Sequence, residues 1–238
     1  MKRILILIDA QNFTNSIVNT SKIKKQDRII DWWKINNFVL EYLKNNIQYK
    51  EDKLTHLRTY YYTGEVTESL LSKINFNIKK VKGKDEEKFL FDKEKAEKIK
   101  KGFEEFEKKA NNYYFFEIRK KPLQYSPNKG IFQKGVDVQI AVDLVSQAYL
   151  NTYDILVLFS GDIDLYESLI TIKNLGKHVL IFSSESVMAK ELIRTADMYV
   201  NFDILDDKLL DLFTHIYVKK TLKDKTNWFF VRNHWKLC

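Results

Sequence analysis

Short apolar runs that end abruptly in polar residues dominate the hydrophobic pattern of this chain. Residues 155–159 (Ile-Leu-Val-Leu-Phe) pass directly into Ser160-Gly161-Asp162-Ile163-Asp164, and residues 4–8 pass into Asp9-Ala10-Gln11-Asn12. Such short, uninterrupted runs are typical of strands buried on both faces of a parallel sheet. Helical periodicity follows over 165–172. Because ligands bind at the carboxyl edge of open α/β sheets, both polar turns are candidate site elements.

The rest of the pattern alternates strands with helices. It predicts strands at 54–64 (with Gly64 as the break), 113–120 (closed by Pro122), 176–182 and 198–202, a loop up to Gln133, and helices at 30–44 (capped by Asp31), 136–148, 187–195 and 205–219. Alternation of this kind predicts an α/β fold with a mostly parallel sheet flanked by helices.

Residues 65–112 differ from the rest because they mix lysine and glutamate with apolar residues at helical spacing. The simplest interpretation is one long surface helix with ion-paired outer faces. The alternative is an insertion that contacts nucleic acid or a partner. The predicted division of the chain is residues 1–205 as one domain that includes this insertion, and 206–238 as a C-terminal helix with a basic aromatic tail.

Charge and composition narrow the class of protein. The 238-residue chain is 45% hydrophobic, enough for a substantial core, and its net charge of +8 favours an anionic partner such as nucleic acid. Its single cysteine, Cys238, excludes an internal disulfide and, with no signal-type start, predicts a cytoplasmic protein. No apolar run approaches the length of a membrane span. The oligomeric state is left open, with a homodimer as one alternative.

Four aspartates fall at the predicted element boundaries: Asp9, Asp137, Asp162 and Asp164. Clustered carboxylates repel one another unless a cation neutralises them, and Mg²⁺ and Mn²⁺ prefer oxygen ligands. A pair of such ions activates water and stabilises the leaving oxygen in phosphodiester cleavage. Each aspartate alone could instead be a helix cap or a first-turn residue. Asp143 comes six residues after Asp137, about 120° around the helix, so the two cannot both point directly inward, and Asp143 is expected to play a supporting role.

Three blocks resemble the NYN domain, the LabA-like branch of the PIN-like nucleases: 8–12, 134–138 with Asp143, and 160–164. The resemblance extends to about residue 205 and implies a Rossmann-like sheet with a metal-dependent ribonuclease site. By position, Asp9, Asp137, Asp162 and Asp164 would be the catalytic, metal-binding residues. Asn12 would orient Asp9 or a phosphate, Ser160 would support the Asp162 turn, and Lys134, Arg119, Lys120 and Lys121 are candidate phosphate contacts. Ala10, where the family often has glycine, and the long charged segment depart from the pattern.

The leading hypothesis is therefore a Mg²⁺- or Mn²⁺-dependent endoribonuclease that binds RNA. The alternative is an RNA-binding or regulatory module that keeps the site and cleaves little. A haloacid-dehalogenase-type phosphatase is disfavoured because its nucleophilic aspartate should follow its strand directly and early in the chain, whereas Ser160 and Gly161 intervene here and the motif is late.

Overall fold

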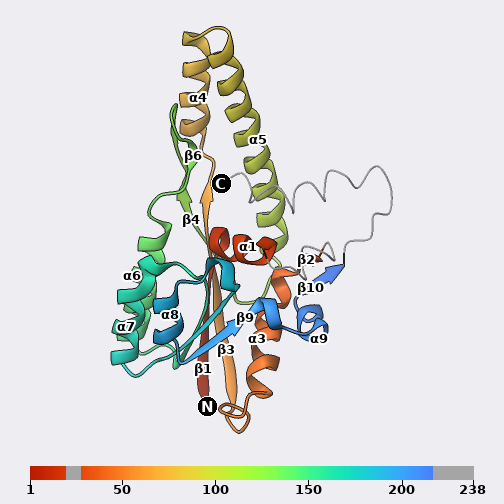
Figure 1. Ribbon diagram of the computed structural model, residues 1–238, viewed down its shortest axis with the longest axis vertical. Coiled ribbons are helices and arrows are strands. Elements are labelled where there is room, and N and C mark those ends of the chain that lie inside the picture. The colour runs from red at the N-terminus through yellow and green to blue at the C-terminus, as the bar shows by residue number, and fades with distance from the viewer. Residues whose placement is uncertain (20–27, 217–238) are drawn as a thin grey trace.

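A six-stranded parallel sheet forms the centre of the molecule, confirming the predicted fold class. The computed structural model describes residues 1–19 and 28–216 (Figure 1). Across the sheet the strands follow the order β4 (Phe116–Pro122), β3 (Leu54–Glu65), β1 (Lys2–Asp9), β7 (Ile155–Phe159), β8 (His178–Ser183) and β9 (Met198–Asn201). The apolar runs of β1, β7 and β8 are fully buried, as expected for central parallel strands, whereas the edge strand β4 is only partly covered.

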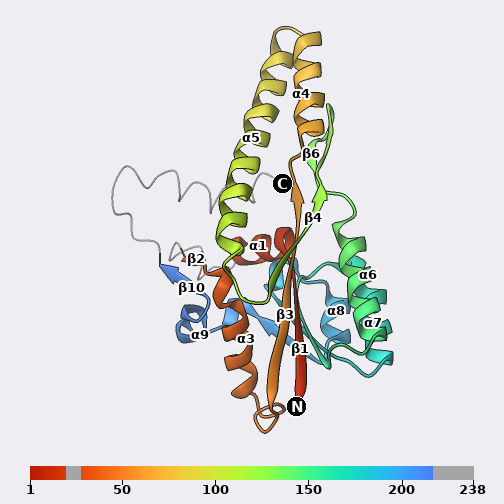
Figure 2. The same cartoon turned by 180° about the vertical axis from the view of Figure 1, so that it is seen from behind.

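Helices cover both faces of this sheet (Figures 1 and 2). One face carries α1 (Ala10–Asn19), α3 (Ile35–Lys44) and α9 (Asp207–Asp211), and the other carries α6 (Val136–Tyr149), α7 (Tyr166–Asn174) and α8 (Lys190–Thr195). Side chains of β1 alternate between the two resulting cores: Ile4, Ile6 and Ile8 enter the first, and Leu5 and Leu7 the second. No helix in the described part of the chain is long and apolar enough to cross a membrane.

The order of the strands reverses beside β1. From β1 the chain builds outward through β3 to β4, and it then returns to the other side of β1 for β7, β8 and β9. The carboxyl ends of β1 and β7 therefore flank a topological switch point, where neighbouring connections leave toward opposite faces. The two polar turns singled out in the sequence both lie here.

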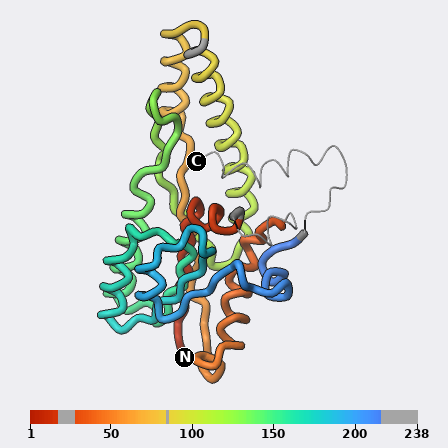
Figure 3. Tube along the Cα trace, viewed as in Figure 1, coloured from red at the N-terminus to blue at the C-terminus, as the bar shows by residue number. Residues whose placement is uncertain are grey.

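The charged segment forms two antiparallel helices instead of one. These are α4 (Glu68–Lys80) and α5 (Lys84–Ala110), joined by a turn in which Gly83 adopts φ +76°. The expected loop before Gln133 also contains structure, a ribbon of β5 (Gln124–Ser126) and β6 (Gly130–Phe132). We call α4, α5 and this ribbon the arm. Figure 3 shows that the arm rises beyond the carboxyl edge of the sheet.

Other boundaries also differ from the sequence prediction. The predicted helix at 205–219 is wrong over its described part, because only α9 is helical and 214–216 form β10 (Thr214–Ile216), which pairs with β2 (Arg28–Ile30). The remainder of that prediction, with the basic aromatic tail, falls on residues 217–238, which lie outside the described part. Likewise, β2 and a 3-10 turn (η1, Trp32–Lys34) precede α3, with Asp31 at the cap position. Three further 3-10 turns are η2 (Ile163–Leu165), η3 (Glu185–Val187) and η4 (Phe202–Ile204).

The end of β3 and the start of β4 differ from the sequence prediction. β3 continues through Gly64 instead of stopping there, because this glycine leaves room for Leu123: a Cβ at Gly64 would lie 2.2 Å from Leu123 Cδ2. β4 starts at Phe116 and not at Tyr113, because Tyr113 N still bonds to Ala110 O at the end of α5, and Phe115 turns the chain with φ +54°.

Candidate metal centre

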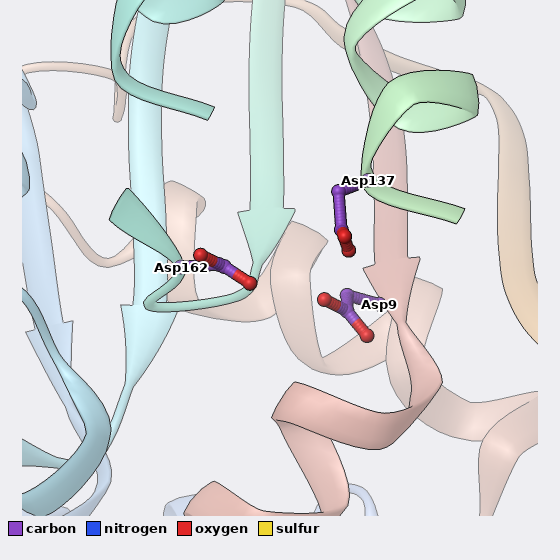
Figure 4. Close-up of side chains that lie close together, drawn as sticks. All are labelled: Asp9, Asp137 and Asp162. Carbon is purple, nitrogen blue, oxygen red and sulfur yellow. The ribbon is translucent and has the colours of Figure 1, made fainter. Parts of the chain in front are cut away.

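Three of the four predicted aspartates converge at the switch point. Asp9 ends β1, Asp137 lies in the first turn of α6, and Asp162 follows β7. Each offers one carboxylate oxygen, and these three oxygens all lie within 4.8 Å of one another. Figure 4 shows the side chains pointing toward a common space. Residues distant in the chain thus form one acidic cluster.

Asp9 is the most buried member, with 2% of its surface exposed. Burial, together with the charges of Asp137 and Asp162, raises its pKa to about 7, against the hydrogen bonds from Asn12 and Ser160 that lower it. Asp9 also caps α1, because its Oδ1 accepts a hydrogen bond from the Asn12 backbone N–H at 3.1 Å. The capping alternative and the metal-ligand hypothesis are therefore compatible.

Asn12 and Ser160 connect the two turns. The Asn12 side-chain Oδ1 accepts a hydrogen bond from the Gly161 backbone N–H at 2.8 Å. Ser160 Oγ donates to Asp9 Oδ2 at 3.4 Å and accepts from the Asp162 backbone N–H at 3.2 Å. The hydrogen bonds place both side chains behind the carboxylates, where they fix the relative position of Asp9 and Asp162.

Gly161 is required by close packing. A Cβ at this position would lie 2.5 Å from the Val187 carbonyl oxygen and 2.9 Å from Met188 Cα, and Ala189 N already donates to the Gly161 carbonyl at 3.2 Å. The backbone of the segment after β8 therefore packs directly against the turn that carries Asp162. Sequence reasoning did not find this contact, because nothing local in 183–189 marks a neighbour some 25 residues away.

Asp164 lies at the edge of the cluster. It is exposed and is not one of the three converging residues. Its backbone N–H donates to Asp162 Oδ1 at 3.0 Å, so it closes the turn that orients Asp162. Its charge still reaches the site: burial raises the pKa of Asp137, and Asp162 and Asp164 raise it further.

The cluster fits a hard divalent cation. Among the described residues, no lysine, arginine or histidine forms an ion pair with Asp9, Asp137 or Asp162. Three carboxylates with one of them buried are electrostatically costly without a positive partner. Oxygen donors alone suit Mg²⁺ or Mn²⁺, and the donor set contains no histidine or cysteine that would favour Zn²⁺.

The candidate phosphate contacts divide into two groups. Lys121 and Lys134 are exposed, and neither forms an ion pair within the described ranges. Arg119 instead binds Asp143 and Glu117, with its guanidinium 3.8 Å from the Tyr60 ring centroid.

Lys120 likewise has protein partners. Its Nζ bonds to Glu107 at 2.9 Å and to Glu65 at 3.2 Å. Arg119 and Lys120 are therefore neutralised within the fold, which leaves Lys121 and Lys134 as the cations of this group with no acidic partner among the described residues.

Asp143 has a separate set of partners. Tyr62 donates its hydroxyl to Asp143 Oδ2 at 2.9 Å, and Arg119 binds the same carboxylate. Tyr62 is the β3 neighbour of Asp9 in the sheet register. Asp143 thus joins α6 to β3 and β4 beside the acidic cluster and is not one of its three converging ligands.

Fold and site define an α/β protein with a carboxylate cluster at a sheet switch point. The sequence profile of the NYN domain matches residues 3–206. The chain therefore belongs to the NYN domain family, a family of PIN-like nucleases, as the motif resemblance predicted.

Two individual proteins are similar to this chain. The "Low amplitude and bright protein LabA" of Synechococcus elongatus is 26% identical over 76 residues, which span 32% of this chain and 40% of that protein. The crystal structure of a protein of unknown function, VPA0982 from Vibrio parahaemolyticus, superposes with a TM-score of 0.52 at 18% identity, covering 90% of this chain and 96% of the other. At that identity the second likeness concerns the fold alone.

Proposed function

We propose that this protein is a divalent-metal-dependent endoribonuclease. The observation that carries the proposal is the convergence of Asp9, Asp137 and Asp162 within 4.8 Å at the switch point, with Asp9 buried. Membership of a PIN-like nuclease family and the net charge of +8 support a nucleic-acid substrate. Mg²⁺ or Mn²⁺ is the proposed cofactor and RNA the proposed substrate.

The three converging aspartates would hold the cation. When bound, a cation of this type activates water and stabilises the charge on the leaving oxygen during phosphodiester hydrolysis. Asp164 adds negative charge at the rim and orients Asp162 through its backbone. Asn12 and Ser160 act as positioning residues through the hydrogen bonds that link the two turns. Lys134 is proposed to contact a substrate phosphate.

Two parts of the proposal rest on the sequence alone. A cytoplasmic location follows from the cysteine content, and a homodimer remains one alternative for the oligomeric state. Neither affects the chemistry assigned to the aspartates.

The activity is tested by replacing Asp162 with asparagine. Asp162→Asn keeps the size of the side chain and the acceptor for the Asp164 N–H, but removes a charge needed for a divalent cation. We expect Mn²⁺-dependent cleavage of single-stranded RNA to fall at least about 100-fold, as for other groups that stabilise transition-state charge. The matched control is Asp52→Asn at the opposite edge of the sheet, where Asp52 pairs with Lys2; it should cleave normally.

Two results would contradict the proposal. Full activity in Asp162→Asn would show that the acidic cluster does not carry out the cleavage. Wild-type protein that binds RNA with steep salt dependence, yet cleaves none of a varied set of RNAs with Mg²⁺ or Mn²⁺, would favour the RNA-binding module instead.

A further inference from the structure

The arm has its own small hydrophobic core. Its helices and ribbon bury Leu70 and Ile74 of α4, Ala96 and Ile99 of α5, and Leu123 and Ile131 on either side of the ribbon turn. The ends of β3 and β4 carry this unit, since Gly64 and Glu65 still pair with Lys121 and Pro122. The ribbon is therefore held in place by packing.

The ribbon also leads directly into the acidic cluster. β6 ends at Phe132, Gly135 turns the chain with φ +80°, and α6 with Asp137 follows at once. Because consecutive Cα atoms are about 3.8 Å apart, the Cα atoms of Lys134 and Asp137 are separated by no more than about 11 Å. Figures 1 and 2 both show the ribbon descending from the arm to the start of α6.

Residues 118–136, which contain the ribbon, carry only positive charge. No acidic residue occurs between Glu117 and Asp137. Lys121, Lys129 and Lys134 are exposed along this segment, and none of them forms an ion pair with a described residue. Lys129 Nζ lies 5.9 Å from the Phe132 ring centroid, so a cation and a partly exposed aromatic ring stand together.

The neighbouring helix α5 has the opposite character. It contains nine lysines and nine acidic residues. Lys93 and Lys98 pair with Glu97 and Glu94 along the helix, and Lys100 pairs with Glu68 of α4. The charges of α5 therefore sum to zero and several of them are paired, whereas Lys121, Lys129 and Lys134 lie in a stretch without acidic residues and form no ion pair among the described residues.

A phosphodiester backbone needs such cations near this site. The aspartate cluster itself repels phosphate, so a strand that reaches it must be held by positive charges outside the cluster. The segment between β4 and α6 carries three of them, Lys121, Lys129 and Lys134, and Asp137 follows three residues after the last. A cation beside an aromatic ring is also the combination found where single strands bind without strong sequence preference.

We propose that the segment from the end of β4 to the start of α6, which carries Lys121, Lys129 and Lys134, is a track that binds the backbone of single-stranded RNA and leads it to the acidic cluster. This inference rests on the proposed nuclease function only for the site to which the RNA is led. The binding of RNA by the three lysines does not depend on that function. The proposal assigns the holding of substrate to residues 121–134, and not to the charged helices of the 65–112 insertion.

The test measures binding separately from cleavage. In full-length protein carrying Asp162→Asn, the triple change Lys121→Gln, Lys129→Gln and Lys134→Gln is compared with Lys93→Gln, Lys98→Gln and Lys100→Gln on α5. Both triples remove three positive charges, so a difference reports position and not net charge. Binding of a fluorescently labelled single-stranded RNA is followed by anisotropy over a range of salt concentrations, with circular dichroism as the check of folding.

The ribbon triple should weaken binding about tenfold or more and lower the slope of log K against log salt by about 2, from three lost contacts of about 0.7 each. The α5 triple should change affinity less than about twofold. Equal losses in both triples, or none in either, would overturn the track. If wild-type protein cleaves RNA but the ribbon triple binds normally, the track fails and the nuclease stands. If the ribbon triple loses binding while the wild type never cleaves, the track stands and the nuclease proposal fails.

Discussion

At the scale of single residues, Asp9 combines a helix cap with a carboxylate buried among other carboxylates. Its backbone position follows from the end of β1 and the start of α1, and the capping hydrogen bond from Asn12 stabilises its charge. Burial and the charges of Asp137 and Asp162 outweigh that bond and raise its pKa to about 7. In the metal-free protein, the ionised carboxylate of Asp9 is therefore a buried charge that destabilises the fold.

Asp9→Asn should stabilise the metal-free protein increasingly as the pH rises. The folded pKa of about 7 exceeds the ordinary value of 3.8. The stability contributed by protonated Asp9 is present in full below about pH 4 and is lost as the pH rises to about 7. Relative to wild type, the variant should gain up to about 4 kcal/mol between pH 4 and pH 8. Urea unfolding with EDTA at several pH values measures this difference.

Asp154→Asn provides a control of opposite sign. A hydrogen bond from Arg3 lowers the pKa of Asp154 to about 2. Asp154 therefore stabilises the fold above about pH 4 and loses that contribution as the pH falls toward 2. Its variant should lose stability relative to wild type as the pH rises through this range. A difference for Asp9→Asn that does not vary with pH would show that Asp9 titrates like an exposed carboxyl.

At the scale of elements, the arm depends on how β3 and β4 extend beyond the sheet. Gly64 lies within β3 and faces Leu123, which belongs to the core of the arm. The sequence suggests a break at this glycine, yet the strand continues because a missing side chain here creates space for a neighbouring one. The arm, with Lys129 in its ribbon, is joined to the sheet through this contact.

Gly64→Ala should destabilise the protein, and Leu123→Ala should reduce that effect. The added Cβ would lie 2.2 Å from Leu123 Cδ2 and 2.7 Å from Cγ, an overlap that typically costs about 1–3 kcal/mol. Leu123→Ala alone should cost about 2–4 kcal/mol because Leu123 is buried. Urea unfolding of the two single variants and the double variant should give a double-variant loss smaller than the sum. Strict additivity would show that the two residues do not oppose each other.

At the scale of the whole molecule, sheet topology assembles the site. Asp9 and Asp162 follow adjacent parallel strands, and Asp137 reaches the same point from the helix on one face. No single segment contains a complete set of ligands. Cation binding should therefore stabilise the native state without binding the unfolded chain, where the aspartates are far apart.

Mn²⁺ should raise the melting temperature of the wild type. At a concentration 100 times the dissociation constant, binding adds about 2.7 kcal/mol, or about 5–10 °C for a chain of this size. Asp137→Asn should lose most of this shift, and Asp52→Asn should keep it. Differential scanning fluorimetry with increasing Mn²⁺ gives the comparison. A shift of equal size in wild type and Asp137→Asn would mean that Mn²⁺ binds elsewhere.

The sequence by itself determined the α/β class, the strands that end in Asp9 and before Asp162, and the helix that begins near Asp137. These follow from local signals, namely uninterrupted apolar runs, polar turns and helix starts. The ribbon was also within reach, since Pro127, Asn128 and Gly130 between Tyr125 and Ile131 form a hairpin signal that the loop interpretation overlooked.

Only the tertiary structure decided which charges face one another. Arg119 and Lys120 look in sequence like Lys121 and Lys134, but the fold pairs the first two with acidic residues and gives the others no acidic partner within the described ranges. Asp164 looks like Asp162, but the turn between them directs only Asp162 into the cluster. The physical reason is that burial and ion pairing depend on neighbours contributed by distant segments, which local spacing does not specify.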